Sequence, residues 1–153
     1  MWYSIIEDKE KLYFYVDLQL ILFLSGRFCF MFEFQNPNPR GNFTGDCVIR
    51  ALAIAQDKTW DDVYLELMTY GYSMKDMPSS NNVWGYYLHN NGYRRHNIPD
   101  ICPNCVNIRD FVANSNGEYI VGTGTHVVAA KNNVYYDTWD SGNEIPIYFW
   151  KKG

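Results

Sequence analysis

The order of helix-like and strand-like segments restricts the fold more than any other feature of this sequence. Apolar residues recur every three or four positions in three early segments, at residues 47–56, 60–71 and 81–90. A short helix is expected after them, and runs rich in Val, Ile and Tyr then follow, at residues 119–122, 126–130, 134–139 and 145–150. Helices that precede strands indicate an α+β domain, in which N-terminal helices pack on a C-terminal, mostly antiparallel sheet.

Two of the strand-like runs are joined by residues 132–133, both asparagine, which suit a tight hairpin because asparagine tolerates positive φ. With this turn, His126 lies opposite Trp139, and Asp137 is the diagonal neighbour of His126 on the same face. A carboxylate beside a histidine is the arrangement that orients an imidazole as a base. Asp140 has the opposite parity, but it follows the strand end and could bend back, so it is the alternative partner.

Cys47 stands at the start of the first expected helix, after a polar loop. Gly45 permits a tight turn there, and Asp46 is a good N-cap. In a first helical turn, unpaired backbone N–H groups and the helix dipole favour a thiolate, which is the nucleophilic form of cysteine. The Asp46 carboxylate would raise the pKa of the thiol, but we expect it to cap the helix and face solvent. The alternative is that Cys47 is a small apolar residue of a buried helix.

Residues 1–34 differ from the rest of the chain because they are strongly apolar and aromatic. Charged residues interrupt their apolar part, at Asp17, Arg27 and Glu33. Its longest uncharged run, residues 18–26, is far shorter than the roughly 20 residues of a membrane-spanning helix. The features of a secretory signal are also missing. We expect an appendage at residues 1–34, with Met31 as an alternative start, and one domain at residues 35–153. The alternative is a strand or helix that packs on this domain.

Charge and cysteine content exclude several classes of protein. The formal net charge is −4, so the chain lacks the positive charge typical of nucleic-acid binding. The basic cluster at residues 94–96 is expected to be a solvated turn. Four cysteines in 153 residues do not make a disulfide scaffold, which favours a reducing compartment such as the cytoplasm.

Cys102 and Cys105 have the spacing of half a zinc knuckle. A structural zinc needs two further ligands, and the remaining candidates, Cys29 and His96, do not have a matching spacing. Neighbouring prolines predict a loop at this position, whereas a redox motif belongs at a strand-to-helix junction. Structural or incidental cysteines are therefore favoured over a metal or redox site, and no metal or cofactor is expected.

The segment Gly45–Ala51 resembles the loop and helix that carry the nucleophile in the papain-like cysteine peptidase superfamily, and His126–Ala130 resembles its base-bearing strand. Residues 137–139, Asp-Thr-Trp, are similar to papain's Asn-Ser-Trp, in which the Asn orients the catalytic His and the Trp shields that contact. Asn42 matches the position of the oxyanion Asn in ubiquitin-specific proteases, whereas papain's Gln would stand at Gly41. The chain also looks like small proteins of bacteria and their phages.

The resemblance implies a cysteine hydrolase that cleaves a peptide or isopeptide amide bond through a Cys47–His126–Asp137 triad and an acyl-enzyme. Asn42 and the backbone N–H of Cys47 would stabilise the oxyanion, and Trp139 would shield His126. The expected partner is a peptide or protein substrate, with no nucleic acid, no membrane span and no cofactor. Two alternatives remain, a papain-like binding module without activity and a small zinc-stabilised interaction domain.

Overall fold

The computed structural model describes residues 31–99 and 105–153, so the expectations for residues 1–30 and for Cys102 lie outside it. The helices of the described part are α2 (Cys47–Gln56), α3 (Trp60–Met74), α4 (Asn81–Asn90) and α5 (Ile108–Ala113). Its strands are β1 (Phe32–Phe34), β2 (Tyr93–Asn97), β3 (Glu118–Gly122), β4 (Val127–Lys131), β5 (Val134–Asp137) and β6 (Tyr148–Lys152). None of these helices is both long enough and apolar enough to cross a membrane.

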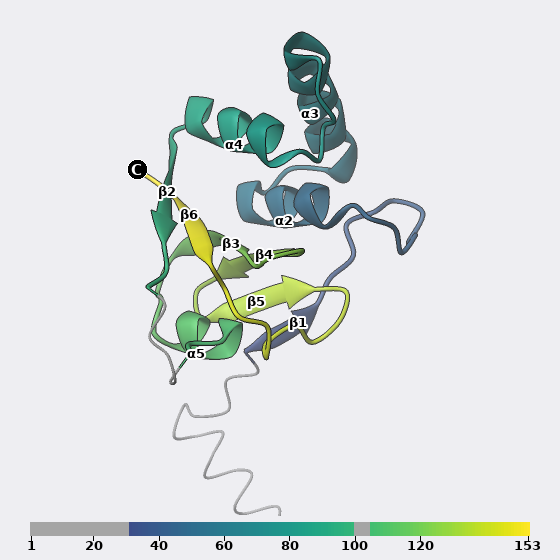
Figure 1. Ribbon diagram of the computed structural model, residues 1–153. Helices are drawn as coiled ribbons and strands as arrows, with labels where there is room; N and C mark the ends of the chain where they lie inside the picture. The colour runs from purple at the N-terminus through teal and green to yellow at the C-terminus, as the bar shows by residue number, and fades with distance from the viewer. Residues whose placement is uncertain (1–30, 100–104) are drawn as a thin grey trace, which may run out of the picture. The chain divides into compact units, whose positions relative to one another are not determined.

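The strands form one six-stranded sheet in the order β1-β5-β4-β3-β6-β2. β1 runs parallel to β5, whereas every other neighbouring pair in the sheet is antiparallel. Helices α2, α3 and α4 lie on one side of the sheet, and α5 lies on the other (Figure 1). The prediction of an α+β domain with a mostly antiparallel sheet is therefore confirmed.

A tight hairpin joins β4 to β5 at the two asparagines, as predicted. Asn132 and Asn133 have φ values of 50° and 67°, the left-handed conformation that asparagine tolerates. The Asn133 side-chain amide donates hydrogen bonds to the backbone oxygens of Val112 and Ala113 at the end of α5, at 3.0 and 3.1 Å. The hairpin is thus fixed to α5, and it sets the end of β5 beside the start of β4.

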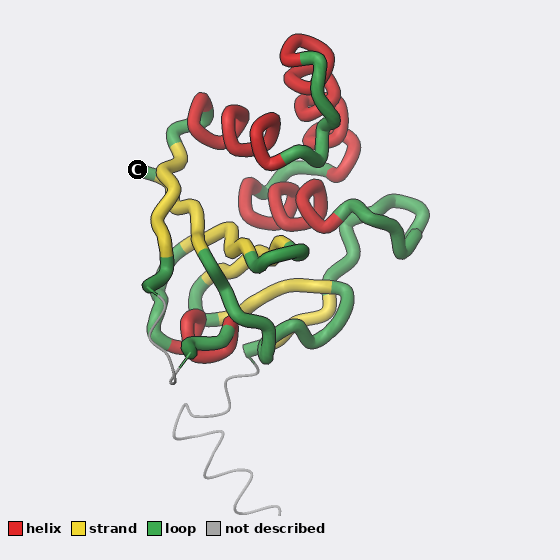
Figure 2. The backbone as a smooth tube through the Cα atoms, in the orientation of Figure 1, coloured by secondary structure: helices red, strands yellow, loops and turns green. Residues whose placement is uncertain are grey.

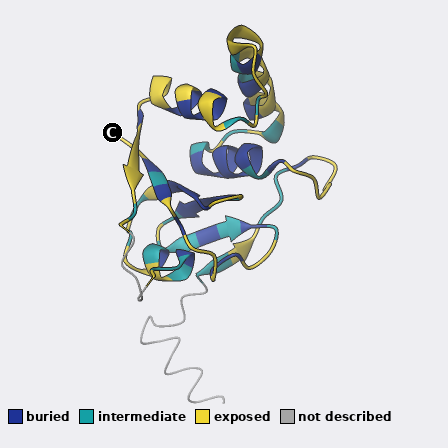
Figure 3. Ribbon diagram, in the orientation of Figure 1, coloured by how far each residue is buried: buried dark blue, intermediate teal, exposed yellow. Residues whose placement is uncertain are grey.

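Apolar side chains form a core on each face of the sheet. Figure 3 shows buried residues along α2 and the central strands. The larger core lies under α2, where every residue from 48 to 55 is buried. Leu52 from α2 and Trp84 from α4 are among its least exposed members. On the other face, Ile108 and Val112 of α5 pack against strand residues that include Tyr135. Close packing along the whole of α2 fixes the position of its first residue, Cys47.

Helix α3 continues to Met74, past its expected end at residue 71, and three segments of the sheet also differ from the sequence predictions. Residues 32–34 form β1 beside β5, so the sheet begins before the expected domain start at residue 35. Residues 94–96 were expected in a solvated turn, but they belong to β2, an exposed strand at the edge of the sheet. The last strand begins at Tyr148 and not at residue 145. These strands are defined by pairing with distant partners, and local sequence patterns do not carry that information.

The loop of residues 35–46 leads from β1 into α2 (Figure 2). Two asparagine side chains fold its first part, because Asn36 Oδ1 accepts a hydrogen bond from the Asn38 backbone N–H at 3.1 Å, and Asn38 Oδ1 accepts one from the Arg40 N–H at 3.0 Å. Such local bonds are the reason that asparagine favours turns. These hydrogen bonds therefore fix the conformation of the first part of the loop that leads to α2.

Candidate active site

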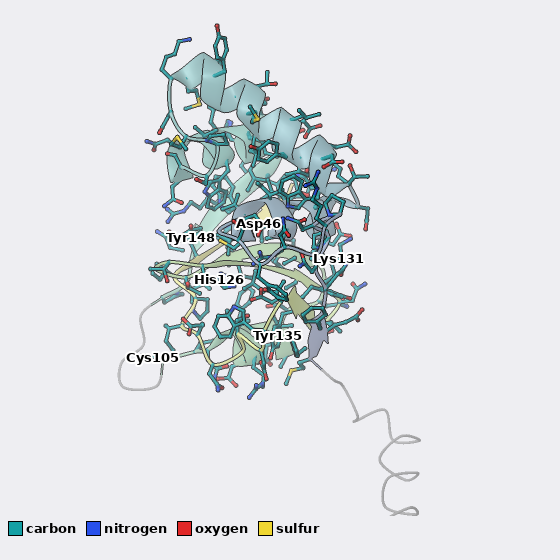
Figure 4. All side chains as sticks on the ribbon, turned by 90° about the vertical axis from the view of Figure 1, so that its right-hand side faces the viewer. Asp46, Cys105, His126, Lys131, Tyr135 and Tyr148 are labelled. Atoms are coloured by element: carbon teal, nitrogen blue, oxygen red, sulfur yellow. The ribbon has the colours of Figure 1, made fainter. Side chains whose placement is uncertain are left out.

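Three elements bring the side chains of Cys47, His126 and Asp137 together. Cys47 is the first residue of α2, His126 directly precedes β4, and Asp137 is the last residue of β5. Helix α2 packs across the central strands, and Figure 4 labels His126 where this helix faces the sheet. Cys47 is partly buried and packs against the core under α2. The three side chains meet as the sequence predicts.

A hydrogen bond joins the Cys47 thiol to the His126 ring. Burial raises the pKa of Cys47, but the bond to His126, the His126 charge, the Val127 backbone N–H and the Arg50 charge together outweigh it. The pKa of the thiol therefore lies below its ordinary value. A thiol with a lowered pKa carries more of the nucleophilic thiolate near neutral pH.

The other side of the His126 ring is held by a carboxylate. His126 Nε2 lies 2.6 Å from Asp137 Oδ2, which leaves the Nδ1 atom for the Cys47 thiol. Burial lowers the pKa of His126, but the bonds to Asp137 and Cys47 and their charges raise it to about 9. Between the lowered pKa of Cys47 and about pH 9, the pair is therefore a thiolate beside an imidazolium.

Asp137 is 4% exposed, and its carboxylate is held from several directions. Burial raises its pKa, but the stronger effects of its surroundings, led by the hydrogen bond and charge of His126 and including the Thr138 backbone N–H, lower it below the ordinary value. The Thr138 N–H donates to Asp137 Oδ1 at 2.7 Å. Asp137 is thus ionised at neutral pH, and it both orients the His126 ring and stabilises its positive charge.

The alternative partner, Asp140, does not contact His126. Its carboxylate accepts hydrogen bonds from the Tyr135 hydroxyl, from the Gly142 backbone N–H at 3.1 Å and from Arg109 Nη2 at 3.2 Å. These contacts fix the loop after β5. The prediction from strand parity that Asp137 contacts His126 is therefore confirmed, and Asp140 holds the loop that Asp137 precedes.

Asp46 corrects one sequence prediction. It occupies the N-cap position of α2, but its side chain makes no capping hydrogen bond, and it is 5% exposed where it was expected to face solvent. The carboxylate instead pairs with Arg50 one turn later and accepts hydrogen bonds from Trp60 Nε1 at 2.9 Å and Asn38 Nδ2 at 3.2 Å. The first-turn N–H groups of α2 are therefore left uncapped beside Cys47.

Arg50 is a site residue that the sequence analysis missed. It is 6% exposed, and its guanidinium lies between the carboxylates of Asp46 and Asp137, with Nη2 at 3.9 Å from Asp137 Oδ1. The Arg50 cation thus interacts with two buried carboxylates. Its charge also lowers the pKa of Cys47. The four-residue spacing from Asp46 to Arg50 on a helix was the sequence signal for this pair.

The two accessory predictions have different outcomes. Trp139 lies beside His126, with ring centroids 5.5 Å apart and planes at 38°, as expected of a residue that shields the imidazole. Asn42 is exposed, and within residues 31–99 and 105–153 only its backbone oxygen takes part in a hydrogen bond, from Asn36 Nδ2 at 3.2 Å. No hydrogen bond joins the described Asn42 side chain to Cys47, so its oxyanion role stays a prediction.

Cys105 is exposed, and it is labelled well away from His126 in Figure 4. Cys102, with which it shares the spacing of half a zinc knuckle, lies outside the described residues, as does Cys29. Among the residues that the structure does describe, no group of three or more His, Cys, Asp or Glu side chains could hold a metal ion.

Two surface hollows of about 250 and 370 Å³ lie at the C-terminal end of α2, opposite to Cys47. Asp57 and Lys58 line both of them. None of Cys47, His126 and Asp137 lines either hollow, so the reactive side chains and these hollows are separate features of the surface.

The thiolate, imidazolium and carboxylate therefore form one continuous chain of contacts across α2, β4 and β5. This arrangement provides a nucleophile, a base and a group that orients the base. Comparison of the chain with protein-family models, with curated proteins and with solved structures finds no match.

Proposed function

We propose that this protein is a cysteine hydrolase of papain-like type, which cleaves a peptide or isopeptide amide bond through an acyl-enzyme. The observation that carries the proposal is the contact chain from Cys47 through His126 to Asp137, in which His126 Nε2 lies 2.6 Å from Asp137 Oδ2. Partial exposure of the Cys47 residue favours activity over a silent binding module, for which a buried Cys47 would be expected.

The papain-like assignment is supported by the order of the elements. The nucleophile begins the first helix of the described part, the base stands at the start of a strand, and the acid ends the neighbouring antiparallel strand. Trp139 beside His126 adds the expected shield. The same order of residue types is what suggested the superfamily from the sequence.

In the first half of the proposed reaction, the Cys47 thiolate attacks the carbonyl carbon of the amide. A C–S bond forms, and the carbonyl π electrons move to the oxygen to give a tetrahedral oxyanion. When this intermediate collapses, the C–N bond breaks and the His126 imidazolium gives its proton to the leaving nitrogen. The products are a free amine and a thioester on Cys47.

In the second half, water hydrolyses the thioester. Neutral His126 accepts a proton from water as the water oxygen attacks the carbonyl carbon, and a second oxyanion forms. Its collapse breaks the C–S bond, releases a carboxylic acid and returns Cys47 as a thiolate beside the imidazolium. Asp137 stays ionised throughout and holds the ring orientation.

The proposal is tested with p-nitrophenyl acetate, a generic acyl donor, and with a peptide library. We expect release of p-nitrophenolate with one acetyl group located on Cys47 by peptide mass mapping, and cleavage of a subset of the library. Cys47→Ala is the matched control and should do neither. Acetylation of Cys105 as fast as that of Cys47 would contradict the proposal. So would a rate of p-nitrophenolate release that is the same in Cys47→Ala as in the wild type.

Asp137→Ala is expected to slow acetylation of Cys47 by at least about 100-fold, because the His126 ring loses both its orienting bond and the charge that stabilises the imidazolium. Asp140→Ala is the matched control, since the Asp140 carboxylate is half exposed and binds the Gly142 N–H, Tyr135 and Arg109 and not His126. Rates of p-nitrophenolate release compare the two variants. A larger loss in Asp140→Ala would assign the orienting role to Asp140.

A further inference from the structure

Tyr148 of β6 lies on the same face of the sheet as the nucleophile. Gly122 of β3 pairs with Tyr148 on one side and with Val127 of β4 on the other, so the three residues form a row across three strands. The backbone N–H of Val127, at the end of this row, donates a hydrogen bond to Cys47. Tyr148 and Val127 both belong to the core under α2, against which Cys47 packs.

The Tyr148 side chain crosses β3 toward Cys47. A Cβ atom at Gly122 would lie 2.7 Å from the Tyr148 hydroxyl oxygen, so the outer end of the ring lies directly over this glycine. Since Gly122 stands between Tyr148 and Val127, a side chain that reaches over it extends from β6 toward β4. Glycine at this position leaves the room that the ring needs.

The ring is held in place by its neighbours. The Arg95 guanidinium lies over it, with Cζ at 4.2 Å from the ring centroid, and the Trp84 ring stacks beside it at 6.2 Å and 27°. Tyr148 is 9% exposed, yet its hydroxyl has no hydrogen-bond partner among residues 31–99 and 105–153. A donor is thus held near the sulfur and is not used by the fold.

We propose that the Tyr148 hydroxyl is an oxyanion donor, which stabilises the tetrahedral oxyanion on Cys47 together with the uncapped first-turn N–H groups of α2. This inference rests on the proposed hydrolase function. A fixed donor that is aimed at developing charge in a partly buried site is the arrangement that lowers such a barrier most. It gives the site a side-chain donor, a role that the exposed Asn42 was expected to fill.

The protonation state of Tyr148 suits this role. Burial, the largest effect, and the Cys47 charge raise the pKa of the Tyr148 hydroxyl, whereas the Arg95 charge lowers it. The net result is a pKa above the ordinary value of tyrosine. The hydroxyl therefore keeps its proton throughout the working range of the thiolate–imidazolium pair, and it can donate a hydrogen bond to an oxyanion.

Two reactions of the same sulfur separate an oxyanion donor from a residue that only supports the fold. Iodoacetamide alkylates Cys47 by displacing iodide from a saturated carbon, so no oxyanion forms. In acetylation by p-nitrophenyl acetate, the C–S bond forms as an electron pair moves to the carbonyl oxygen, and the pair returns as p-nitrophenolate leaves. Only the second reaction needs an oxyanion donor.

We expect Tyr148→Phe to slow acetylation by about 10- to 100-fold and to change alkylation by less than about twofold at the same pH. Tyr93→Phe is the matched control, because it also removes the hydroxyl of a buried tyrosine in this core. The Tyr93 hydroxyl lies near Gln56, the last residue of α2, and therefore at the opposite end of this helix from Cys47. The control should change neither rate.

Equal acetylation by Tyr148→Phe and the wild type would overturn the assignment of Tyr148 and leave the hydrolase proposal standing. A parallel loss of acetylation and alkylation would also overturn it, since Tyr148 would then act on the thiolate or the fold. A wild-type protein that alkylates at Cys47 but never acetylates there would instead contradict the hydrolase function itself.

Discussion

Replacing His126 with glutamine is expected to abolish nearly all acyl transfer to Cys47, with a loss of about 10³-fold or more. The ring is the direct partner of the thiol, and its hydrogen bond and charge are the main reasons that the pKa of Cys47 is lowered. Without the ring, the thiol is mostly protonated at neutral pH, and no group delivers a proton to a leaving amine.

The measurement is the rate of Cys47 acetylation by p-nitrophenyl acetate at neutral pH. His89→Gln is the matched control, because this exposed histidine of α4 makes the same chemical change far from the thiol. If His126→Gln acetylates as fast as His89→Gln, then the thiol works without the imidazole and the proposed dyad is wrong.

Replacing Arg50 with methionine is expected to lower the free energy of unfolding by about 3–5 kcal/mol. Arg50 is 6% exposed and faces two carboxylates, Asp46 and Asp137, which are 5% and 4% exposed. Removing the cation leaves the buried Asp46 carboxylate without a charged partner and takes away one of the two cations beside Asp137, the other being His126. This costs more than the pair itself contributes.

Urea unfolding at neutral pH measures the loss. Arg109→Met is the matched control, because its ion pair with Asp140 is largely exposed and is worth about 1 kcal/mol or less. Equal free energies of unfolding for the two variants would mean that the ion pairs of Arg50 with Asp46 and Asp137 contribute little to the stability of the fold. We also expect Arg50→Met to slow acetylation, since Asp137 loses a neighbouring cation.

Features set by local chemistry could be predicted from the sequence. The polar loop before an apolar helix defined α2 from its first residue, Cys47. The paired asparagines fixed the hairpin and its register, and the register then decided between Asp137 and Asp140. In each case the determinant lies within a few residues of the feature that it controls.

Features set by distant contacts could not be predicted in this way. Asp46 has the residue type of an N-cap, but Arg50, Trp60 and Asn38 compete for its carboxylate, and the last two become neighbours only in the folded chain. Tyr148 extends over Gly122 toward β4 because β6 pairs with β3 opposite this glycine. Strand pairing over this sequence distance leaves no local pattern.

The pH dependence of cysteine alkylation tests the central claim most directly. Burial raises the pKa of Cys47, and the stronger effects of His126, the Val127 N–H and Arg50 lower it below the ordinary value. The thiolate is the reactive form, so the alkylation rate should persist as the pH falls, down to a midpoint clearly below the value of about 8.5 for a free thiol.

The experiment is a brief iodoacetamide pulse at a series of pH values, followed by peptide mapping of all four cysteines. We predict that Cys47 is alkylated first near pH 6, ahead of Cys29, Cys102 and Cys105, and that His126→Gln moves its midpoint upward. If Cys105 or another cysteine reacts first, and Cys47 stays inert until the protein unfolds, the account of Cys47 as an activated nucleophile is contradicted.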